Sequence, residues 1–388
     1  MSRLSFSWLH RSAAWRCWAG LGLCLLLTTV ECWLRAPEPV APNAAWPAGT
    51  EAVTGPLVLQ AAGRIPMPAD ALAAHASTLL AMPQGHSAAL QAYWFAGSRE
   101  SGPDVQIAAS EFDRATQQWT PATYVVNRHR AAAVLGFGLR RLGNPVAWRD
   151  GQGRTHLFVV ATGLGGWAAG RILHLRQDTP QEAFHPLGVL PLSWLWNTSH
   201  LVRAMPLPLA DGGMVLPAYF ELGIKYPVAL RFDAAGEFRG MMRMSGRGDL
   251  LQPTLLPRSD TEWVGLLRDN RAQRQLRAVI SHDAGRNWED LPDLDMPNPD
   301  ASVAGLSLRP GLMYLAHNPR AESRAQLVLS RSSDALHWTQ LEVLAQGDGR
   351  SEFSYPSMAW VDGGLWISYT EERRGIAWQR FMPLPATR

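Results

Sequence analysis

Polar and charged residues stand at the ends of short apolar segments of this sequence, where together they could line a pocket. Six of them open a segment, and they are His75, Asn144, Asn197, Gln252, Asn298 and Tyr355. Others close the returning segment, namely Arg99, Glu100, Glu221, Arg268, Asn318 and Glu371 or Glu372, with Asp104 and Arg324 in the loops just beyond. Guanidinium groups bind anions, whereas carboxyl and phenol groups transfer protons or act as nucleophiles. Each residue alone is typical of an ordinary turn or of the surface. The prediction of a site therefore depends on the recurrence of such residues at equivalent positions of a repeated unit.

These segments belong to a unit that occurs six times. In each copy a polar residue, often followed by Pro, opens an apolar strand, a turn follows, and a second apolar strand returns. The copies begin at His75, Asn144, Asn197, Gln252, Asn298 and Ser354, as in "NPVAWRDGQGRTHLFVVATG" and "QPTLLPRSDTEWVGLLR". Further strand-like stretches such as "RAQLVLSRS" lie between them. Six units of about 45 to 70 residues, each long enough for four short strands, predict an all-β fold, a six-bladed β-propeller.

A propeller would bring the polar residues together. In each blade the innermost strand starts at one face of the disc, and the second strand returns to that face antiparallel to the first. The residues that open the first strand and those that close the second would therefore meet around the axis. The sequence predicts a polar pocket at this mouth.

The octapeptide "SHDAGRNW", residues 281–288, predicts a hairpin between two outer strands of a blade. Its Asp-x-Gly turn is followed by Trp288, whose indole we expect to pack between neighbouring blades. Shorter or degenerate copies are "SSDALHW" at 332–338 and "RFDAAGEF" at 231–238. We interpret these segments as scaffold rather than as part of a reactive site.

From about residue 61 to residue 381 the chain resembles the sialidase family, glycosidases that remove terminal sialic acid on a six-bladed propeller marked by Asp-boxes. "SHDAGRNW" is such an Asp-box. "WFAGSRESGPD" looks like the family's Phe-Ala-Glu-x-Arg segment, which is followed by an acid/base aspartate. The resemblance implies that Arg99 is the arginine of this segment and that Asp104 is the acid/base residue. Arg268 and Arg324 match arginines that bind the substrate carboxylate. Tyr355, in "FSYPSMAWVDGGLWISYTEE", matches the nucleophilic tyrosine.

The resemblance implies an exo-acting glycoside hydrolase of the exo-α-sialidase type. Guanidinium groups would hold the carboxylate on the anomeric carbon of the sugar. A neutral phenol is then a better nucleophile than a carboxylate, because a second anion would be repelled by the substrate. Asp104, if it is desolvated in the mouth, would protonate the leaving oxygen and later activate water.

Two positions depart from the family pattern. The family's first arginine lies in a Phe-Arg-Ile-Pro segment where the first blade opens; here "GRIPMPAD" precedes the blade, and we expect His75 in the arginine's place. The glutamate that accepts the tyrosine's proton is replaced by Gln252, and an amide cannot accept that proton. Glu221 is the candidate replacement. The predicted substrate-binding residues are Arg99, Arg268, Arg324, His75, Gln252, Asn144, Asn197 and Asn298.

Two further functions stay open, and a glycan or glycoconjugate is the partner in each. In a polysaccharide lyase, His75 or Tyr355 would abstract the proton α to a uronate carboxylate that arginines neutralise. A non-catalytic carbohydrate-binding propeller is favoured by Gln252 and by the missing first arginine. The 17 tryptophans could supply a stacking surface, although most tryptophans in a propeller belong to the core.

The first 35 residues differ from the rest. Arg3, Arg11 and Arg16 precede an apolar run from Trp18 to Leu34, which predicts a signal-anchor or a signal peptide. No small-x-small cleavage site follows the run, which favours an uncleaved membrane anchor. The preceding positive charges predict a membrane-anchored or secreted protein with the propeller on the extracytoplasmic, periplasmic side. Residues 36–60, rich in Pro and Ala, are expected to form a linker, and residues 61–388 the propeller.

Composition argues against several other classes. All three cysteines lie in the first 35 residues, so no disulfide framework or Cys metal site is expected beyond them. The chain has 36 basic and 33 acidic residues, and four of the basic and one of the acidic lie in that first segment. The balanced remainder argues against a nucleic-acid partner. We find no HExxH spacing, glycine-rich phosphate loop or nucleophile elbow, so no metal or cofactor is expected.

Overall fold

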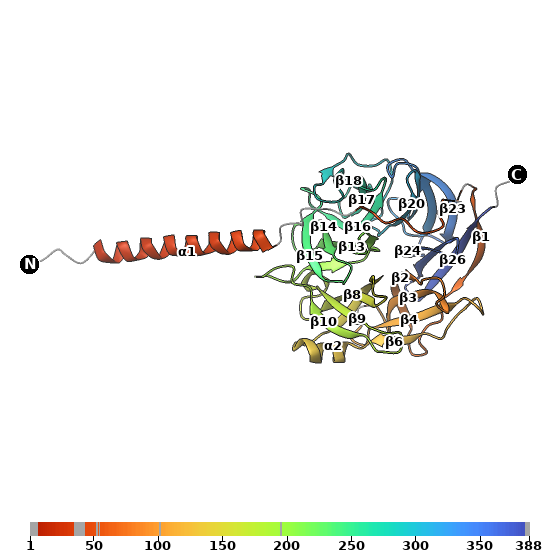
Figure 1. Cartoon of the computed structure of the whole chain (residues 1–388), viewed down its shortest axis with the longest axis horizontal. Helices are drawn as coiled ribbons and strands as arrows, with labels where there is room; N and C mark the ends of the chain where they lie inside the picture. Colours follow the sequence, from red (N-terminus) through yellow and green to blue (C-terminus); the bar gives the residue numbers. More distant parts are fainter. Residues whose placement is uncertain are drawn as a thin grey trace, which may run out of the picture.

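The computed structural model describes residues 7–34 and 43–384, apart from residues 52, 54, 101 and 195. Its strands form six sheets that stand around one axis (Figure 1). Blade one has β2 (Ala73–Ala81), β3 (Ala88–Gly97), β4 (Gln106–Asp113) and β5 (Gln118–Trp119), with β6 (Thr123–Val126) also paired to β4. Blade two has β7 (Arg141–Arg149), β8 (Thr155–Thr162), β9 (Arg171–Gln177) and β10 (His185–Val189). Blade three has β11 (His200–Val202), β13 (Met214–Phe220), β14 (Tyr226–Phe232) and β15 (Phe238–Arg243), with β12 (Leu207–Pro208) paired to β13.

The remaining three blades repeat this order. Blade four has β16 (Leu250–Pro257), β17 (Trp263–Asp269), β18 (Arg277–Ser281) and β19 (Glu289–Asp290). Blade five has β20 (Ala304–Arg309), β21 (Leu312–His317), β22 (Gln326–Ser332) and β23 (Thr339–Gln346). Blade six has β24 (Phe353–Val361), β25 (Gly364–Glu371) and β26 (Gly375–Pro383), and its outer strand is β1 (Leu57–Arg64), which precedes blade one in the sequence. The prediction of an all-β six-bladed propeller is confirmed.

The ring closes by pairing the two ends of the propeller sequence. β1 runs antiparallel to β26, and the two strands lie side by side in Figure 1. The inner strand β2 of blade one contacts β24 of blade six and β7 of blade two. β3 and β8, the second strands of blades one and two, are buried at every position. Most of their residues are apolar, because both faces pack against neighbouring blades.

The octapeptide at residues 281–288 is the turn between β18 and β19, as expected. The Asp283 carboxylate accepts hydrogen bonds from the Asn287 amide (2.8 Å) and the Ser281 hydroxyl (3.0 Å). Gly285 has a φ of 83°, and a Cβ there would meet the Trp263 ring at 2.8 Å. Trp288 packs against a core cluster built from blades three and four. A fourth turn of this kind, missed in the sequence, is held by Asp113, which accepts from the Thr116 amide at 2.7 Å.

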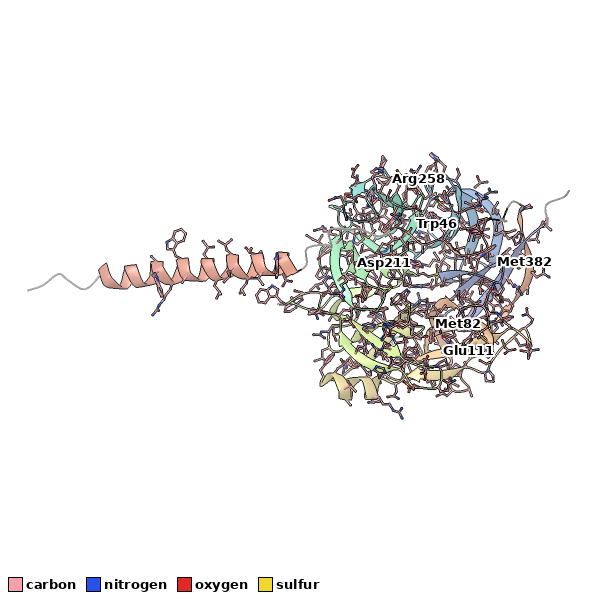
Figure 2. The ribbon with its side chains drawn as sticks, viewed as in Figure 1. Trp46, Met82, Glu111, Asp211, Arg258 and Met382 are labelled. Atoms are coloured by element: carbon pink, nitrogen blue, oxygen red, sulfur yellow. The ribbon has the colours of Figure 1, made fainter. Side chains whose placement is uncertain are left out.

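The segment before the propeller only partly matches the expected linker. Ala44 bridges to Leu209 in blade three, and the Trp46 indole donates to the Asp260 carboxylate at 3.0 Å. Figure 2 shows Trp46 on the body of the propeller. The buried Thr50 hydroxyl donates to the Leu308 carbonyl at 2.8 Å. Residues 44–50 are therefore packed on the blades, and β1 begins four residues before the expected boundary, because the ring needs a fourth strand in blade six.

In the described residues two α-helices and a short 3-10 helix, η1 (Trp167–Ala169), accompany the strands. α1 (Ser7–Leu34) is present where a helix was expected, and its described apolar side chains, among them Trp18 and Leu25, are exposed. Within the described residues no helix combines the length and apolarity needed to cross a membrane. Arg3 and residues 35–42 lie outside the described part, so membrane anchoring and a periplasmic location stay predictions. α2 (Arg128–Leu135) is a short helix between blades one and two, capped by Asn127.

Candidate active site at the propeller mouth

Each inner strand has at least one residue near its start with a left-handed backbone. The six that we call mouth positions are Ala76 (φ 55°), Asn144 (42°), Ser199 (70°), Gln252 (46°), Asp300 (52°) and Tyr355 (52°). In blades one, two, four and six the pairing register shifts at this point, which marks a β-bulge. A bulge leaves a residue unpaired and redirects its side chain. The recurrent feature at the mouth is therefore a backbone conformation, and different side chains occupy it in different blades.

The residues predicted to open the inner strands coincide with the mouth positions in only three blades. Asn144, Gln252 and Tyr355 occupy them, whereas three predicted residues precede them and require correction. Asn197 accepts from the Leu192 amide (3.1 Å) and donates to the Leu190 carbonyl (2.9 Å), and Asn298 is bonded to both backbone groups of Ala301.

The two asparagines stabilise the loops that lead into β11 and β20. His75, the third of these residues, is buried and its ring lies 4.3 Å from that of Tyr355. Because side chains alternate between the faces of a strand, a shift of one residue along the strand places a side chain on the opposite face and changes its contacts. His75 is thus a packing partner of Tyr355, and its expected role in place of the first arginine stays a prediction.

Tyr355 lies among groups that favour its ionised form. Its hydroxyl accepts a hydrogen bond from Arg268 Nη1 at 3.3 Å. Burial opposes ionisation of this phenol, but the charges of Arg268 and Arg324 and a hydrogen bond from Gln252 outweigh that penalty. The pKa of Tyr355 therefore lies below its usual value of 10. A phenol of lowered pKa can act as a nucleophile or as a base at a pH where an ordinary tyrosine is fully protonated.

Arg268 connects two mouth positions to the phenol. Its Nε donates to Asp300 Oδ1 at 2.6 Å and its Nη1 donates to Gln252 Oε1 at 3.0 Å. Gln252 Nε2 in turn lies 3.4 Å from the hydroxyl of Tyr219. The other oxygen of Asp300 accepts from Asn270 at 3.0 Å. Arg268 is thereby held in one orientation next to the phenol oxygen.

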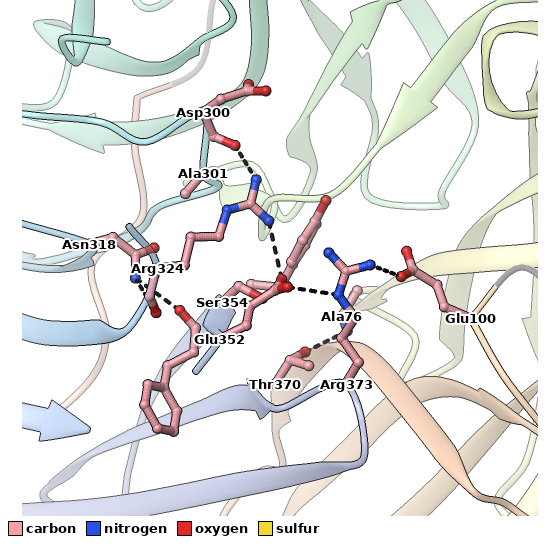
Figure 3. Close-up of polar contacts among 12 residues, drawn as sticks. Ala76, Glu100, Asp300, Ala301, Asn318, Arg324, Glu352, Ser354, Thr370 and Arg373 are labelled. Carbon is pink, nitrogen blue, oxygen red and sulfur yellow. Dashed lines mark hydrogen bonds and ion pairs between the residues drawn. The ribbon is translucent and has the colours of Figure 1, made fainter. Parts of the chain in front are cut away.

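Two more guanidinium groups are held by a second carboxylate (Figure 3). Glu352 accepts from Arg324 Nη1 at 3.2 Å and from Arg373 Nε at 2.7 Å. Arg324 also donates to the backbone carbonyl of Asp300, and Arg373 pairs with Glu100. These contacts link blades one, five and six across the mouth. We call Gln252, Arg268, Asp300, Arg324, Glu352, Tyr355 and Arg373 the mouth cluster.

The residue at the mouth position of blade one is Ala76, which carries no polar side chain. Its amide donates to the Thr370 hydroxyl at 2.9 Å, and the amide of the nearby Ala74 donates to the Arg373 carbonyl at 3.0 Å. Arg64, from the "GRIP" segment, pairs with Glu371 and is mostly exposed. Blade one therefore supplies no guanidinium group at its mouth position, and Arg373 from blade six lies next to that position.

Arg99 and Asp104 belong to an exposed loop outside the mouth cluster. Asp104 accepts from the amide (2.6 Å) and the hydroxyl (2.9 Å) of Ser98. These bonds from Ser98 lower the pKa of Asp104, although partial desolvation opposes them. A general acid needs the opposite shift, so the expected desolvation of Asp104 in the mouth is corrected. Arg99 lines a small hollow with Glu100, His75 and Arg373 at the edge of the cluster.

Glu221 has the electrostatic property that Asp104 lacks. It follows β13, and its amide donates to the carbonyl of Ser199, the mouth position of blade three, at 2.9 Å. Burial raises the pKa of its carboxyl group, against the charges of Arg268 and Lys225 and in concert with that of Asp300. A carboxyl group with a raised pKa can hold a proton at higher pH than an exposed one.

Sequence reasoning missed Asp300, Glu352 and Arg373. Asp300 lies two residues after the predicted Asn298, and Glu352 precedes the strand that carries Tyr355. Arg373 comes from the turn "EERRG", where charged residues usually face solvent. The one available signal was proximity to segments already singled out. Within the part of the chain that the structure describes, no group of three His, Cys, Asp or Glu side chains could hold a metal ion.

A cavity of about 570 Å³ lies on the same axis but does not contain the mouth cluster. The later parts of the inner strands line it, with Leu79, Ala147, Leu306 and Met358 among the lining residues. Trp46 from the N-terminal segment also contributes. This apolar chamber therefore belongs to the opposite end of the inner strands, and the residues capable of chemistry are gathered at the mouth.

Glu352 provides a pH-dependent test of the cluster. Burial opposes its charge, but hydrogen bonds from Arg373 and Ser354 and the charges of Arg373 and Arg324 outweigh burial and lower its pKa to about 2. Its ordinary value is 4.5, so the ionised group stabilises the fold above pH 4.5, and this contribution is lost as the pH falls toward 2. By linkage it amounts to about 3 kcal/mol.

As the pH falls from 4.5 to about 2, we expect the free energy of unfolding of Glu352→Gln to decline by about 3 kcal/mol less than that of the natural protein. Urea denaturation at a series of pH values measures this. Glu342→Gln, at an exposed position of β23, is the matched control and should follow the natural protein. Equal acid sensitivity in Glu352→Gln and the natural protein would contradict the ion-pair geometry.

Comparison with known proteins identifies the family. The chain belongs to the BNR repeat-like domain family, whose model matches residues 88–367. It is similar in structure to a Hadza microbial sialidase, with a TM-score of 0.67, 16% sequence identity, and coverage of 82% of this chain and 67% of that one. It is also similar to a protein of unknown function from Dyadobacter fermentans, with a TM-score of 0.66, 10% identity, and coverage of 84% and 99%.

Trypanosoma rangeli sialidase is a third similar structure, with a TM-score of 0.65 and 12% identity. The match covers 83% of this chain but 60% of that protein, so the present chain corresponds to part of its length. No curated protein matches the sequence at a significant level. Together the family model and these structures show a sialidase-like BNR propeller.

Proposed function

We propose that this protein is an exo-acting glycoside hydrolase that removes a terminal sugar bearing a carboxylate, with Tyr355 as the nucleophile. The observation that carries the proposal is the phenol of Tyr355, which is half-buried beside Arg268 and whose pKa is lowered by two guanidinium groups. The similarity of the fold to sialidases supports it. Arg268, Arg324 and Arg373 would bind the carboxylate of the sugar, because planar guanidinium groups match a carboxylate in shape and charge.

In this mechanism the Tyr355 oxygen attacks the anomeric carbon while the bond from that carbon to the leaving oxygen breaks. The leaving oxygen takes a proton from a carboxyl group, and Glu221 is our candidate because burial raises its pKa. Water then attacks the anomeric carbon, displaces the tyrosine and gives the free sugar, and the carboxylate takes the proton from that water. Asp104 could take this role only if its loop moved toward the mouth and gave up the bonds from Ser98.

The replacement of a proton-accepting glutamate by Gln252 fits this scheme. Gln252 cannot accept the proton of the phenol, but it orients Arg268 by accepting a hydrogen bond from it, and its bond to Tyr355 favours the phenolate. Ionisation of Tyr355 would then be supported by nearby positive charge and hydrogen bonding. In this scheme the proton of the phenol passes to water before the oxygen attacks.

A polysaccharide lyase is the second candidate, and the same lowered pKa of Tyr355 favours it. A phenolate next to guanidinium groups could remove the proton α to a uronate carboxylate whose charge those groups neutralise. His75 is a poor alternative base, because its burial lowers its pKa to about 3 and its ring is covered. The two reactions differ in product, since elimination leaves a carbon–carbon double bond and hydrolysis does not.

A substrate panel tests the proposal. The purified full-length chain is incubated with sialosides, uronosides and uronate-containing polysaccharides, and the products are analysed by mass spectrometry and ultraviolet absorbance. Release of a free acidic sugar is expected. An unsaturated, ultraviolet-absorbing product would establish the lyase instead. Binding to a glycan array without any product would overturn both and favour a carbohydrate-binding propeller.

A further inference from the structure

Arg203 is a buried arginine that contacts the proposed nucleophile, Tyr355. It takes no part in the reaction scheme above. Arg203 follows β11, the inner strand of blade three, and only 2% of its surface is exposed. Burial lowers the pKa of its guanidinium group to about 10, so the group is still charged at neutral pH. Among the described residues, no carboxylate lies within ion-pair distance of it. Such an uncompensated charge in a protein interior is costly, and its retention calls for a physical reason.

The hydrogen bonds of Arg203 go to two bulges of the inner strands. Its Nη2 donates to the Pro356 carbonyl at 2.8 Å and its Nη1 to the Ser77 carbonyl at 3.4 Å. Pro356 directly follows the left-handed Tyr355, and Ser77 directly follows the left-handed Ala76. In both strands the regular pairing is interrupted at these residues. One side chain from blade three therefore joins the strained segments of blades one and six.

Arg203 also contacts the phenol ring itself. Its guanidinium carbon lies 5.1 Å from the centroid of the Tyr355 ring, which is cation–π geometry. The imidazole of His75 meets the same ring at 4.3 Å with an interplanar angle of 59°. The ring is thus held by a cation and a neutral imidazole, while its hydroxyl reaches Arg268.

We propose that Arg203 is a positioning residue for Tyr355, which holds the ring and the bulged backbone behind it so that the hydroxyl points at the guanidinium groups of the mouth. This inference rests on the proposed role of Tyr355 as nucleophile. The buried charge also favours the phenolate over the neutral phenol, in addition to Arg268 and Arg324. Two further titratable neighbours among the described residues are His75 on β2 and Tyr219 on β13, and burial keeps both neutral.

The experiment measures ionisation of Tyr355 in the full chain without any substrate. The ultraviolet absorbance of phenolate is recorded against pH for the natural protein and for Tyr355→Phe, and the difference isolates Tyr355 from the six other tyrosines. The same pair is then prepared in an Arg203→Met background. We expect Arg203→Met to lower the ionisation constant of Tyr355 by about tenfold or more. Arg203→Lys, which keeps the charge, should lower it less.

Arg309→Met is the matched control, because Arg309 also donates to a backbone carbonyl, that of Val53, but at the other end of β20. It should leave the Tyr355 titration unchanged. An unchanged titration in folded Arg203→Met would overturn the inference, and Arg203→Gln serves in its place if the Met variant does not fold. Since no substrate is used, this result is independent of the panel that tests the proposed hydrolysis. Where hydrolysis is found, kcat of Arg203→Met should fall while KM changes little.

Discussion

Tyr355→Phe is expected to abolish turnover, with kcat at least about 10³-fold below that of the natural protein on the acidic glycoside that the panel identifies. The substitution removes only the attacking oxygen. The ring would keep its contacts with His75 and Arg203, and Arg268 would keep Asp300 and Gln252 as partners. The loss should therefore appear in the chemical step and not in folding.

The measurement combines initial rates of aglycone release with binding of the free acidic sugar by calorimetry. Binding is expected to change by no more than about threefold, because the carboxylate contacts are retained. Tyr369→Phe is the matched control: its hydroxyl donates to the Leu344 carbonyl at 3.3 Å and lies outside the mouth cluster. Retention of a tenth or more of the activity in Tyr355→Phe would exclude a covalent role for this phenol.

Arg268→Met is the second variant with a large expected effect, a fall in kcat/KM of about 10² to 10³-fold. This guanidinium group would bind the substrate carboxylate and lower the pKa of Tyr355 at the same time. Its removal would also leave the Asp300 carboxylate without its closest partner. That uncompensated charge would repel an acidic sugar.

Charge discrimination gives the sharper readout for Arg268. The natural protein should prefer an acidic glycoside over its neutral methyl ester, and Arg268→Met should lose most of this preference. Arg268→Lys should be intermediate, since an ammonium group keeps the charge but not the planar pair of donors. Arg258→Met is the control in the same blade, because Arg258 pairs with Glu262 at the opposite end of β16. Unchanged preference in Arg268→Met would refute its role in carboxylate binding.

In three blades the residue predicted to open the inner strand precedes the observed mouth position. Asn is a frequent turn residue before a strand, and Asn197 and Asn298 both stabilise turns. The mouth positions lie two residues later, at Ser199 and Asp300, where the backbone adopts positive φ. Positive φ at a residue other than Gly has no reliable signal in a sequence.

The residues that hold the substrate group in our proposal come from separate blades. Arg324 and Arg373 are 49 positions apart in the numbering, yet they share Glu352. Such a contact depends on how blades five, six and one are arranged about the axis. Asp104 illustrates the converse case: a well-spaced motif placed it in the site, but local bonds from Ser98 hold it in an exposed turn.

The number of blades, the antiparallel succession of strands within a blade and the identity of Gln252, Arg268, Arg324 and Tyr355 as candidate residues could all be inferred from the amino-acid pattern. These features are local, since alternation, turn residues and strand length act within one repeat of the chain. The pairing of β1 with β26, the shared carboxylate of Glu352 and the buried charge of Arg203 became apparent in the folded molecule alone. They arise from contacts between distant repeats, where burial and the arrangement of neighbouring charges set the protonation state and orientation of each group.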